Sequence, residues 1–273
     1  MRLKMFSELE LEYFQTTLED HVGIIRIDRP PANAHNVHMI LELQRIVEAV
    51  RFDDDVRVAV LGSADDRFFS TGYDIKAIQE KAGEQIGKAS QTSKEVIMKM
   101  RTTDTIFVAM VDGHCMGGGL EFALACDIRF IGDGDYQIGV PEVELGLIPG
   151  EAGTQLLPRY VGRSEALRMM VTGERIGPEQ AVEKGLFDEL HPEGEVEDAA
   201  LEFAGELVEK PNKAIGFNKL AVNEGMELSL WDALAHEREL QNQLFDTPAS
   251  REGVDAFVND REPDFLGAEM DDE

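Results

Sequence analysis

Apolar residues change their spacing along the chain, and the first half alternates between two patterns. Short apolar runs predict strands at residues 13–18, 22–28, 56–61, 105–111, 128–131 and 136–139. Helical spacing predicts a helix over residues 37–52, and a polar helical stretch at 74–100 contains interruptions at Gly83 and Gly87. An apolar helix is expected to begin at Gly117. Alternating strands and helices predict an α/β architecture.

The pattern becomes purely helical after Gly150. Helices are predicted at residues 154–161, 165–171, 178–184, 199–209, 213–223 and 231–245. We therefore expect an α/β core over residues 1–195 and a helical appendage over residues 196–273.

The charge of the chain limits the partners that it can bind directly. The 273 residues include 54 acidic and 26 basic side chains, which gives a net charge of −28. Nucleic acids and anionic membrane surfaces require a basic footprint, so neither is an expected partner. Such strong like charge repels itself at low ionic strength and is screened by concentrated salt. This favours a halophilic protein, with an ordinary acidic protein as the alternative.

The cysteines, the histidines and the N-terminal segment show no pattern typical of a disulfide framework, a metal site or a targeting sequence. Cys115 and Cys126 fit neither a metal motif nor a disulfide framework, which favours a reduced cytoplasmic protein. Residues 1–14 lack the apolar stretch of a signal peptide, and no run is long enough to span a membrane. His35 and His38 have no evident partner ligands, so we interpret them as a surface pair and expect no metal site.

The segment CMGGGLEFALACD, residues 115–127, places three glycines before an apolar helix. Its spacing is neither a phosphate loop nor a dinucleotide fingerprint. A helix that begins with bare backbone offers free N–H groups to developing negative charge, although close packing against a sheet would also explain the glycines. Glu121 lies in the first turn among apolar neighbours. Buried carboxylates are rare unless they are paired or functional, or bond free N–H groups at their own helix start.

A second carboxylate follows in VPEVELGLIPG, where Glu142 ends a predicted strand. Taken alone, Glu142 is typical of a surface ion pair. Two carboxylates from consecutive elements can instead face one cavity, where proximity and desolvation separate their pKa values for acid and base work.

The segment 68–74 supplies a third candidate feature between a strand and a helix. Thr71 and Gly72 offer unencumbered backbone, and Asp74 suits the start of the next helix. The segment is either an ordinary turn or one half of an oxyanion hole. In an oxyanion hole, each N–H donor stabilises the transition state by ~3 kcal/mol.

These motifs in this order resemble the enoyl-CoA hydratase/isomerase, or crotonase, superfamily. The resemblance runs from GIIRIDRPPANA through RFFSTGYDIKAI and VDGHCMGGGLEFALACDIRF to VTGERIGPEQAVEKGLFDEL and REGVDAFVNDREPDF. It implies a spiral of ββα turns and a C-terminal helical region that builds homotrimers or hexamers. It also implies acyl-CoA thioester substrates and no separate cofactor.

The resemblance further implies roles for individual residues. Thr71 and Gly118 match the positions whose N–H groups hold the thioester oxygen, and Glu121 and Glu142 match the two glutamates that add water to enoyl-CoA. The remaining substrate-binding positions that we expect are Gly72, Tyr73, Asp74 and Gly150.

The chain departs from the family pattern at several positions. Glu151 stands where a small residue is more common, and would add a third carboxylate if it points inward. Tyr73 also replaces a small residue. The basic residues expected near CoA are few, with Lys76 and Arg29 as candidate substitutes.

Retention of both glutamates favours hydration of the 2,3 double bond of an enoyl-CoA. Δ3-Δ2 isomerisation, decarboxylation and thioester hydrolysis remain alternative reactions on the same scaffold. A non-catalytic acyl-CoA-binding homologue is the alternative from another functional class.

Overall fold

Two β-sheets form the centre of the molecule, seen here in a computed structural model that describes residues 5–80 and 83–270. The larger sheet has the order β1-β2-β3-β5-β7-β10, and the smaller has the order β4-β6-β8-β9. The strands are β1 (Phe14–Glu19), β2 (Val22–Ile27), β3 (Val58–Ser63), β4 (Phe68–Ser70), β5 (Ile106–Val111), β6 (His114–Met116), β7 (Ile128–Gly132), β8 (Ile138–Gly139), β9 (Arg175–Ile176) and β10 (Glu189–His191).

Helices surround the sheets and dominate the second half of the chain. They are η1 (Phe6–Glu8), α1 (Val37–Phe52), α2 (Ile75–Glu80), α3 (Gly83–Thr102), α4 (Gly118–Ala125), η2 (Pro141–Leu145), α5 (Gly153–Val161), α6 (Arg163–Thr172), α7 (Pro178–Glu183), α8 (Val196–Val208), α9 (Asn212–Gly225), α10 (Leu230–Asn242), α11 (Pro248–Val258) and α12 (Phe265–Met270). The predicted helix at 74–100 is divided into α2 and α3, and residues 81–82 between them lie outside the described residues. Gly87 lies within α3 and does not interrupt it.

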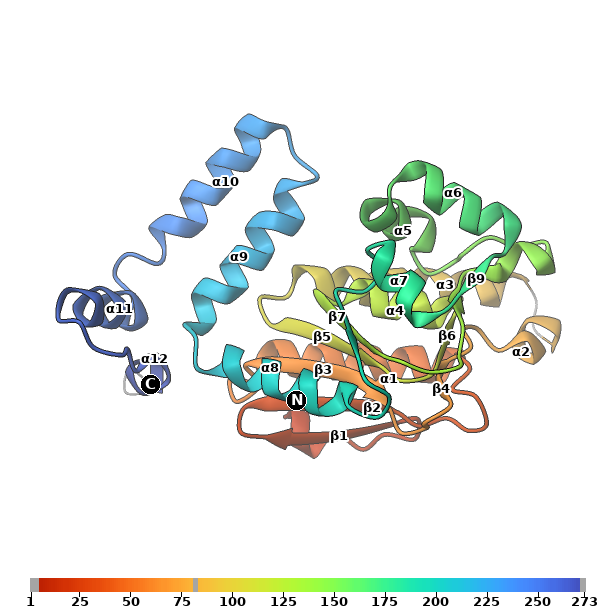
Figure 1. The fold of residues 1–273 in the computed structure, drawn as a ribbon, viewed down its shortest axis with the longest axis horizontal. Coiled ribbons are helices and arrows are strands. Elements are labelled where there is room, and N and C mark those ends of the chain that lie inside the picture. The colour runs from red at the N-terminus through yellow and green to blue at the C-terminus, as the bar shows by residue number, and fades with distance from the viewer. Residues whose placement is uncertain (1–4, 81–82, 271–273) are drawn as a thin grey trace.

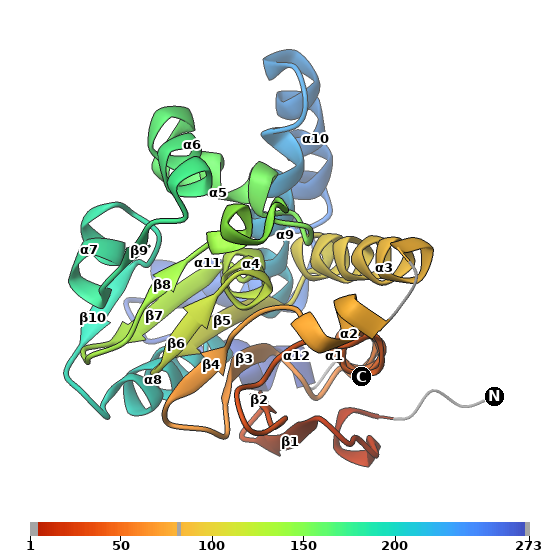
Figure 2. The ribbon, with the colours of Figure 1, turned by 90° about the vertical axis from the view of Figure 1, so that its right-hand side faces the viewer.

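The chain winds as the predicted spiral of ββα turns. After the β1–β2 hairpin, each turn adds one strand to each sheet and then a helical segment, as in β5, β6 and α4. The neighbours β2, β3, β5 and β7 run parallel in the larger sheet, and β4, β6 and β8 run parallel in the smaller one. Because parallel strands end at the same edge of a sheet, the segments after β4, β6 and β8 meet there (Figure 2).

Helix α8 covers one face of the larger sheet (Figure 1). Its small residues Ala200 and Ala204 pack against a strip of buried apolar side chains that includes Ile24, Val60 and Val108. Because α8 buries its apolar face against the sheet, it is part of the core. The projecting helices therefore start with α9, later than the expected boundary after residue 195.

Helices α9 and α10 pack against each other and extend to one side of the sheets (Figure 1). Helix α9 also contacts α3 and β5, and Leu266 of α12 packs against the apolar cluster beneath α8. Large apolar side chains are exposed on this part, including Trp231 at 82% and Phe257 at 87%. Within residues 5–80 and 83–270, no helix combines the length and apolar character needed to cross a membrane.

Candidate active site

Glu121 is a buried carboxylate at the start of α4, with 1% of its surface exposed. Its Oε1 accepts hydrogen bonds from the N–H groups of Glu151 at 2.7 Å and Gly153 at 2.5 Å. The carboxylate therefore binds the start of α5 and not the N–H groups of its own helix. Ala152 between the two donors has a φ of 100°, an unusual value for a residue with a Cβ. This turn directs both N–H groups at Glu121.

Glu142 approaches the same place from η2, directly after β8. A Cβ on Gly117 would lie 2.8 Å from Glu142 Oε1, so the carboxylate lies against the glycine run. Gly117 has a φ of 53°, which also favours glycine there. Glu142 Oε2 is buried and has no hydrogen-bond partner within the described residues. A buried oxygen of this kind is suited to hold a water molecule.

Burial raises the pKa values of both carboxyls. Desolvation is the main reason that the pKa of Glu121 rises to about 8; a negative charge on Glu151 would act in the same direction, and the two N–H donors lower the pKa. The pKa of Glu142 rises to about 7, with desolvation as the largest cause. Both groups are therefore able to exchange protons near neutral pH.

The backbone donors beside these carboxyls come from the segments after β4 and β6. A Cβ on Gly72 would lie 2.8 Å from the nitrogen of Gly118, so the two segments are in close contact. The N–H of Thr71 already donates to the carbonyl of Ala32 at 3.2 Å, and that of Gly72 donates to Ser70. This corrects the expectation that Thr71 supplies a free donor.

Two N–H groups remain available at this junction. In the described part of the chain, neither Tyr73 N–H nor Gly118 N–H has a hydrogen-bond acceptor. Gly118 thus has the free N–H that we predicted, and Tyr73 replaces Thr71 as the second candidate donor. Two free donors beside two carboxyls can hold an anionic oxygen next to a proton-transfer site.

The other expected substrate-binding residues flank this junction. Asp74 accepts a hydrogen bond from Arg29 at 2.9 Å, so Arg29 is already paired. The carbonyl of Gly150 accepts a hydrogen bond from Ser90 of α3 at 2.6 Å, which fixes the loop before α5. Lys76 is exposed, and its ammonium group has no partner in the described residues, so it remains available to an anionic group.

His35 was wrongly interpreted as a surface residue. It is fully buried, stacked on Phe122 with ring centroids 4.3 Å apart, and contacts Glu151 at 3.2 Å. Only His38 is exposed. A usable signal was present, because His35 directly precedes Asn36, the N-cap of α1, and the residue at that position commonly packs inward. Glu151 also points inward, which the sequence left open.

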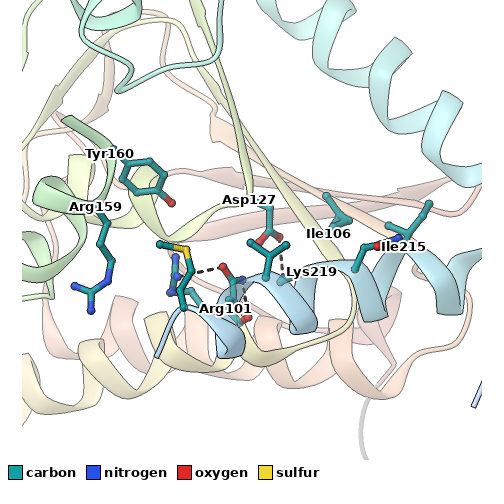
Figure 3. Close-up of a pocket in the computed structure, with 11 residues that line it drawn as sticks. Arg101, Ile106, Asp127, Arg159, Tyr160, Ile215 and Lys219 are labelled. Atoms are coloured by element: carbon teal, nitrogen blue, oxygen red, sulfur yellow. Dashed lines mark hydrogen bonds and ion pairs between the residues drawn. The ribbon is translucent and has the colours of Figure 1, made fainter. Parts of the chain in front are cut away.

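Two hollows lie beside the projecting helices, away from the glutamates. One of 460 Å³ is lined by residues such as Asp127, Arg159 and Lys219, which Figure 3 shows with their neighbours. A second of 730 Å³ borders the outer side of the loop before α5, at Pro149 and Ala152. None of the three glutamates lines either hollow. We place the chemistry at the glutamates, because two free N–H donors lie there beside two carboxyls with raised pKa values.

The spiral of ββα turns thus brings one buried and one half-buried carboxyl beside two free N–H groups, an arrangement that can transfer protons beside an anionic oxygen. The chain matches the family described as Enoyl-CoA hydratase/isomerase over residues 17–268. It therefore belongs to the enoyl-CoA hydratase/isomerase, or crotonase, family.

Individual relatives agree with this assignment. The 2,3-dehydroadipyl-CoA hydratase of Escherichia coli (strain K12) is 33% identical over 251 residues, which span 91% of this chain and 96% of the relative. The crotonyl-CoA hydratase of Syntrophomonas wolfei is 31% identical over 91% of this chain and 95% of its own length. The crystal structure of an enoyl-CoA hydratase from Geobacillus kaustophilus HTA426 matches with a TM-score of 0.93 and 35% identity, over 95% of this chain and 98% of the other. The crotonase fold predicted from the sequence is confirmed.

Proposed function

We propose that this protein adds water across the 2,3 double bond of an enoyl-CoA thioester. The observation that carries the proposal is the pair formed by the buried Glu121 of α4 and the half-buried Glu142 of η2, which lies against Gly117 and is close enough for its charge to raise the pKa of Glu121. Relatives named as hydratases of enoyl-CoA and crotonyl-CoA support the same reaction.

The geometry supports a mechanism with one proton taken and one given. A water molecule held by the carboxyls attacks C3, and the carboxylate form of one glutamate takes a proton from that water. Electron density moves to the thioester oxygen, which accepts hydrogen bonds from the N–H groups of Gly118 and Tyr73. The carboxylic acid form of the other glutamate gives its proton to C2, so that H and OH are added and both glutamates have exchanged states. The pair titrates as a unit, so each role belongs to the pair.

The proposal is tested by incubating the protein with crotonyl-CoA in concentrated KCl. We expect the ultraviolet absorbance of the conjugated thioester to fall and 3-hydroxybutyryl-CoA to accumulate. A 3-enoyl-CoA is assayed in parallel. Conversion of the 3-enoyl-CoA without hydration of crotonyl-CoA would assign isomerisation instead, and release of free CoA would assign hydrolysis.

The pH dependence of hydration follows from the two pKa values. Hydration needs one carboxylate and one carboxylic acid, so its rate rises as the pair loses a first proton and falls as it loses the second. With pKa values of about 7 for Glu142 and about 8 for Glu121, we expect kcat to peak between these values. A profile that stays flat across the neutral range would contradict this assignment.

We propose that the exposed apolar residues of the projecting helices pack against further copies of the chain, in a homotrimer or hexamer. Leu230 at 74% and Trp231 at 82% exposure are adjacent on α10, and Phe257 on α11 is 87% exposed. Monomeric proteins rarely expose such groups together. Light scattering of the purified protein is expected to give a mass of three or six chains, and a monomeric mass would contradict this.

We also propose that the protein is adapted to concentrated salt, because its net charge of −28 is spread over the chain. The screening length is about 3 Å at 1 M salt but about 10 Å at 0.1 M, so dilution restores repulsion between distant carboxylates. We expect the unfolding temperature to fall by several degrees or more when KCl is diluted from multimolar to about 0.1 M. Equal stability at both concentrations would show an ordinary acidic protein.

A further inference from the structure

Glu151, His35 and Ser70 form a buried chain of hydrogen bonds beside the glycine run. His35 Nδ1 lies 3.2 Å from Glu151 Oε2, and His35 Nε2 lies 2.8 Å from Ser70 Oγ. His35 and Ser70 are fully buried, and Glu151 is 3% exposed. The three residues come from distant parts of the chain: the loop before α1, the loop before α5 and the end of β4.

The bonds of Ser70 determine where the protons lie. Ser70 Oγ is 2.7 Å from the carbonyl oxygen of Asn33, and this contact requires the single hydroxyl proton, because a carbonyl cannot donate. Ser70 Oγ also accepts the N–H of Gly72 at 3.1 Å. Its remaining lone pair faces His35, so Nε2 of the imidazole must donate to it. The tautomer of His35 is thereby assigned from its neighbours.

The contact between His35 Nδ1 and Glu151 Oε2 then requires a proton of its own. If both atoms lacked one, two lone pairs would face each other inside a dry site, which is unfavourable. One proton therefore lies between them, on the carboxyl or on the imidazole. In either arrangement the pair of side chains has a net charge of zero.

This pair lies against the reaction site. A Cβ on Gly118 would be 2.6 Å from Glu151 Oε2 and 2.9 Å from His35 Nδ1. The titratable groups that face Glu151, besides His35, are Glu121 of α4, Glu142 of η2 and Tyr73 before α2; a negative charge on Glu151 would raise the pKa of each of these three.

We propose that Glu151 and His35 act as one proton-sharing, net-neutral pair, which keeps a third negative charge out of the site and so sets the pH range in which Glu121 and Glu142 divide acid and base work. Both are positioning residues, since they act through the two glutamates. This role rests on the proposed hydration.

The first test is the pH profile of kcat/KM for crotonyl-CoA in His35→Phe, Glu151→Gln and the double variant. His35→Phe keeps a ring on Phe122 but leaves Glu151 without its partner. When the unpartnered Glu151 ionises in the neutral range, its negative charge raises the pKa values of Glu121 and Glu142, so the acid limb is expected to move to higher pH by more than about half a unit. Glu151→Gln keeps the pair neutral and should leave the limb in place. The double variant should restore the wild-type profile.

Each departure from this pattern overturns the proposal. An unshifted limb in His35→Phe, or a shift that persists in the double variant, would show that His35 has only a packing role. A limb displaced to lower pH in Glu151→Gln would show that Glu151 is an unpaired anion in the wild type. This last result does not depend on whether His35→Phe folds.

A second readout does not require hydration, so it separates failure of this proposal from failure of the proposed function. A carboxyl that is buried without a partner holds its proton more tightly in the folded chain than in the unfolded one. The stability that it contributes is therefore present at low pH and lost as pH rises. Between about pH 4.5 and 6, unfolded wild type carries one proton on its imidazole and the folded pair also holds one, so this site gives wild type no slope. In that range we expect His35→Phe to lose unfolding stability with rising pH more steeply than wild type, and the double variant, which has no titrating group here, to match the wild-type slope. If the free energy of unfolding changed with pH equally in wild type and His35→Phe, the proposed proton-sharing pair would be contradicted.

Discussion

Replacing Glu121 by Gln is expected to lower kcat for crotonyl-CoA hydration by about 10²–10⁴-fold, and replacing Glu142 by Gln should have an effect of the same order. Gln is nearly isosteric with Glu, so its amide oxygen can still accept the N–H groups of Glu151 and Gly153. What it loses is the ability to take or give a proton. Because the two carboxyls act as one unit, the double variant should be little slower than the slower single variant.

Glu144→Gln is the matched control for this series. Glu144 lies on the same η2 turn as Glu142, but it is exposed and paired with Arg175 at the surface. Surface pairs of this kind contribute about 0–1 kcal/mol, so hydration should be unaffected. Turnover in Glu121→Gln or Glu142→Gln that equals the control would remove that residue from the mechanism.

Replacing Lys219 by Met is expected to destabilise the folded protein by about 3–5 kcal/mol, because it breaks a buried ion pair and leaves the partner uncompensated. Lys219 Nζ lies 2.8 Å from Asp127 Oδ2 and donates to the carbonyls of Met100 and Thr105 at 2.7 Å each. Burial lowers the pKa of Lys219 and raises that of Asp127, so each charge depends on the other. The contacts join α9 to the ends of α3 and α4, and Figure 3 shows the ion pair between Lys219 and Asp127.

Urea unfolding at fixed protein and salt concentration measures this loss. Lys213→Met, on the exposed side of the same helix, is the control and should change stability by less than about 1 kcal/mol. Adding Asp127→Asn to Lys219→Met removes the orphaned charge and should recover part of the loss. If Lys219→Met were as stable as Lys213→Met, Lys219 would not anchor α9.

Amphipathic helices were the most predictable part of the fold. The bounds predicted for α1, residues 37–52, are those observed, because its apolar spacing is regular and Asn36 caps its start. The short strands β4, β6, β9 and β10 were not predicted. A strand of two or three residues forms because its neighbours align it, and so few residues carry no detectable period.

The candidate site was predictable at the level of residue types and less so at the level of contacts. Glu121, Glu142 and Gly118 stood out in the sequence because each is a carboxylate or a glycine among apolar residues. The choice between Thr71 and Tyr73 depends on which N–H the carbonyl of Ala32 occupies, and that contact joins residues 39 positions apart. The same holds for His35 and Glu151, which are 116 positions apart and meet only in the folded chain.

The central claim is most directly tested by mass spectrometry of the products formed from crotonyl-CoA in ¹⁸O-labelled water. We predict an intact CoA thioester with one ¹⁸O atom in its acyl part, since the hydroxyl at C3 comes from solvent and the thioester is not cleaved. Label found only in a released free acid, or turnover without any label, would contradict hydration and assign a different reaction to the same scaffold.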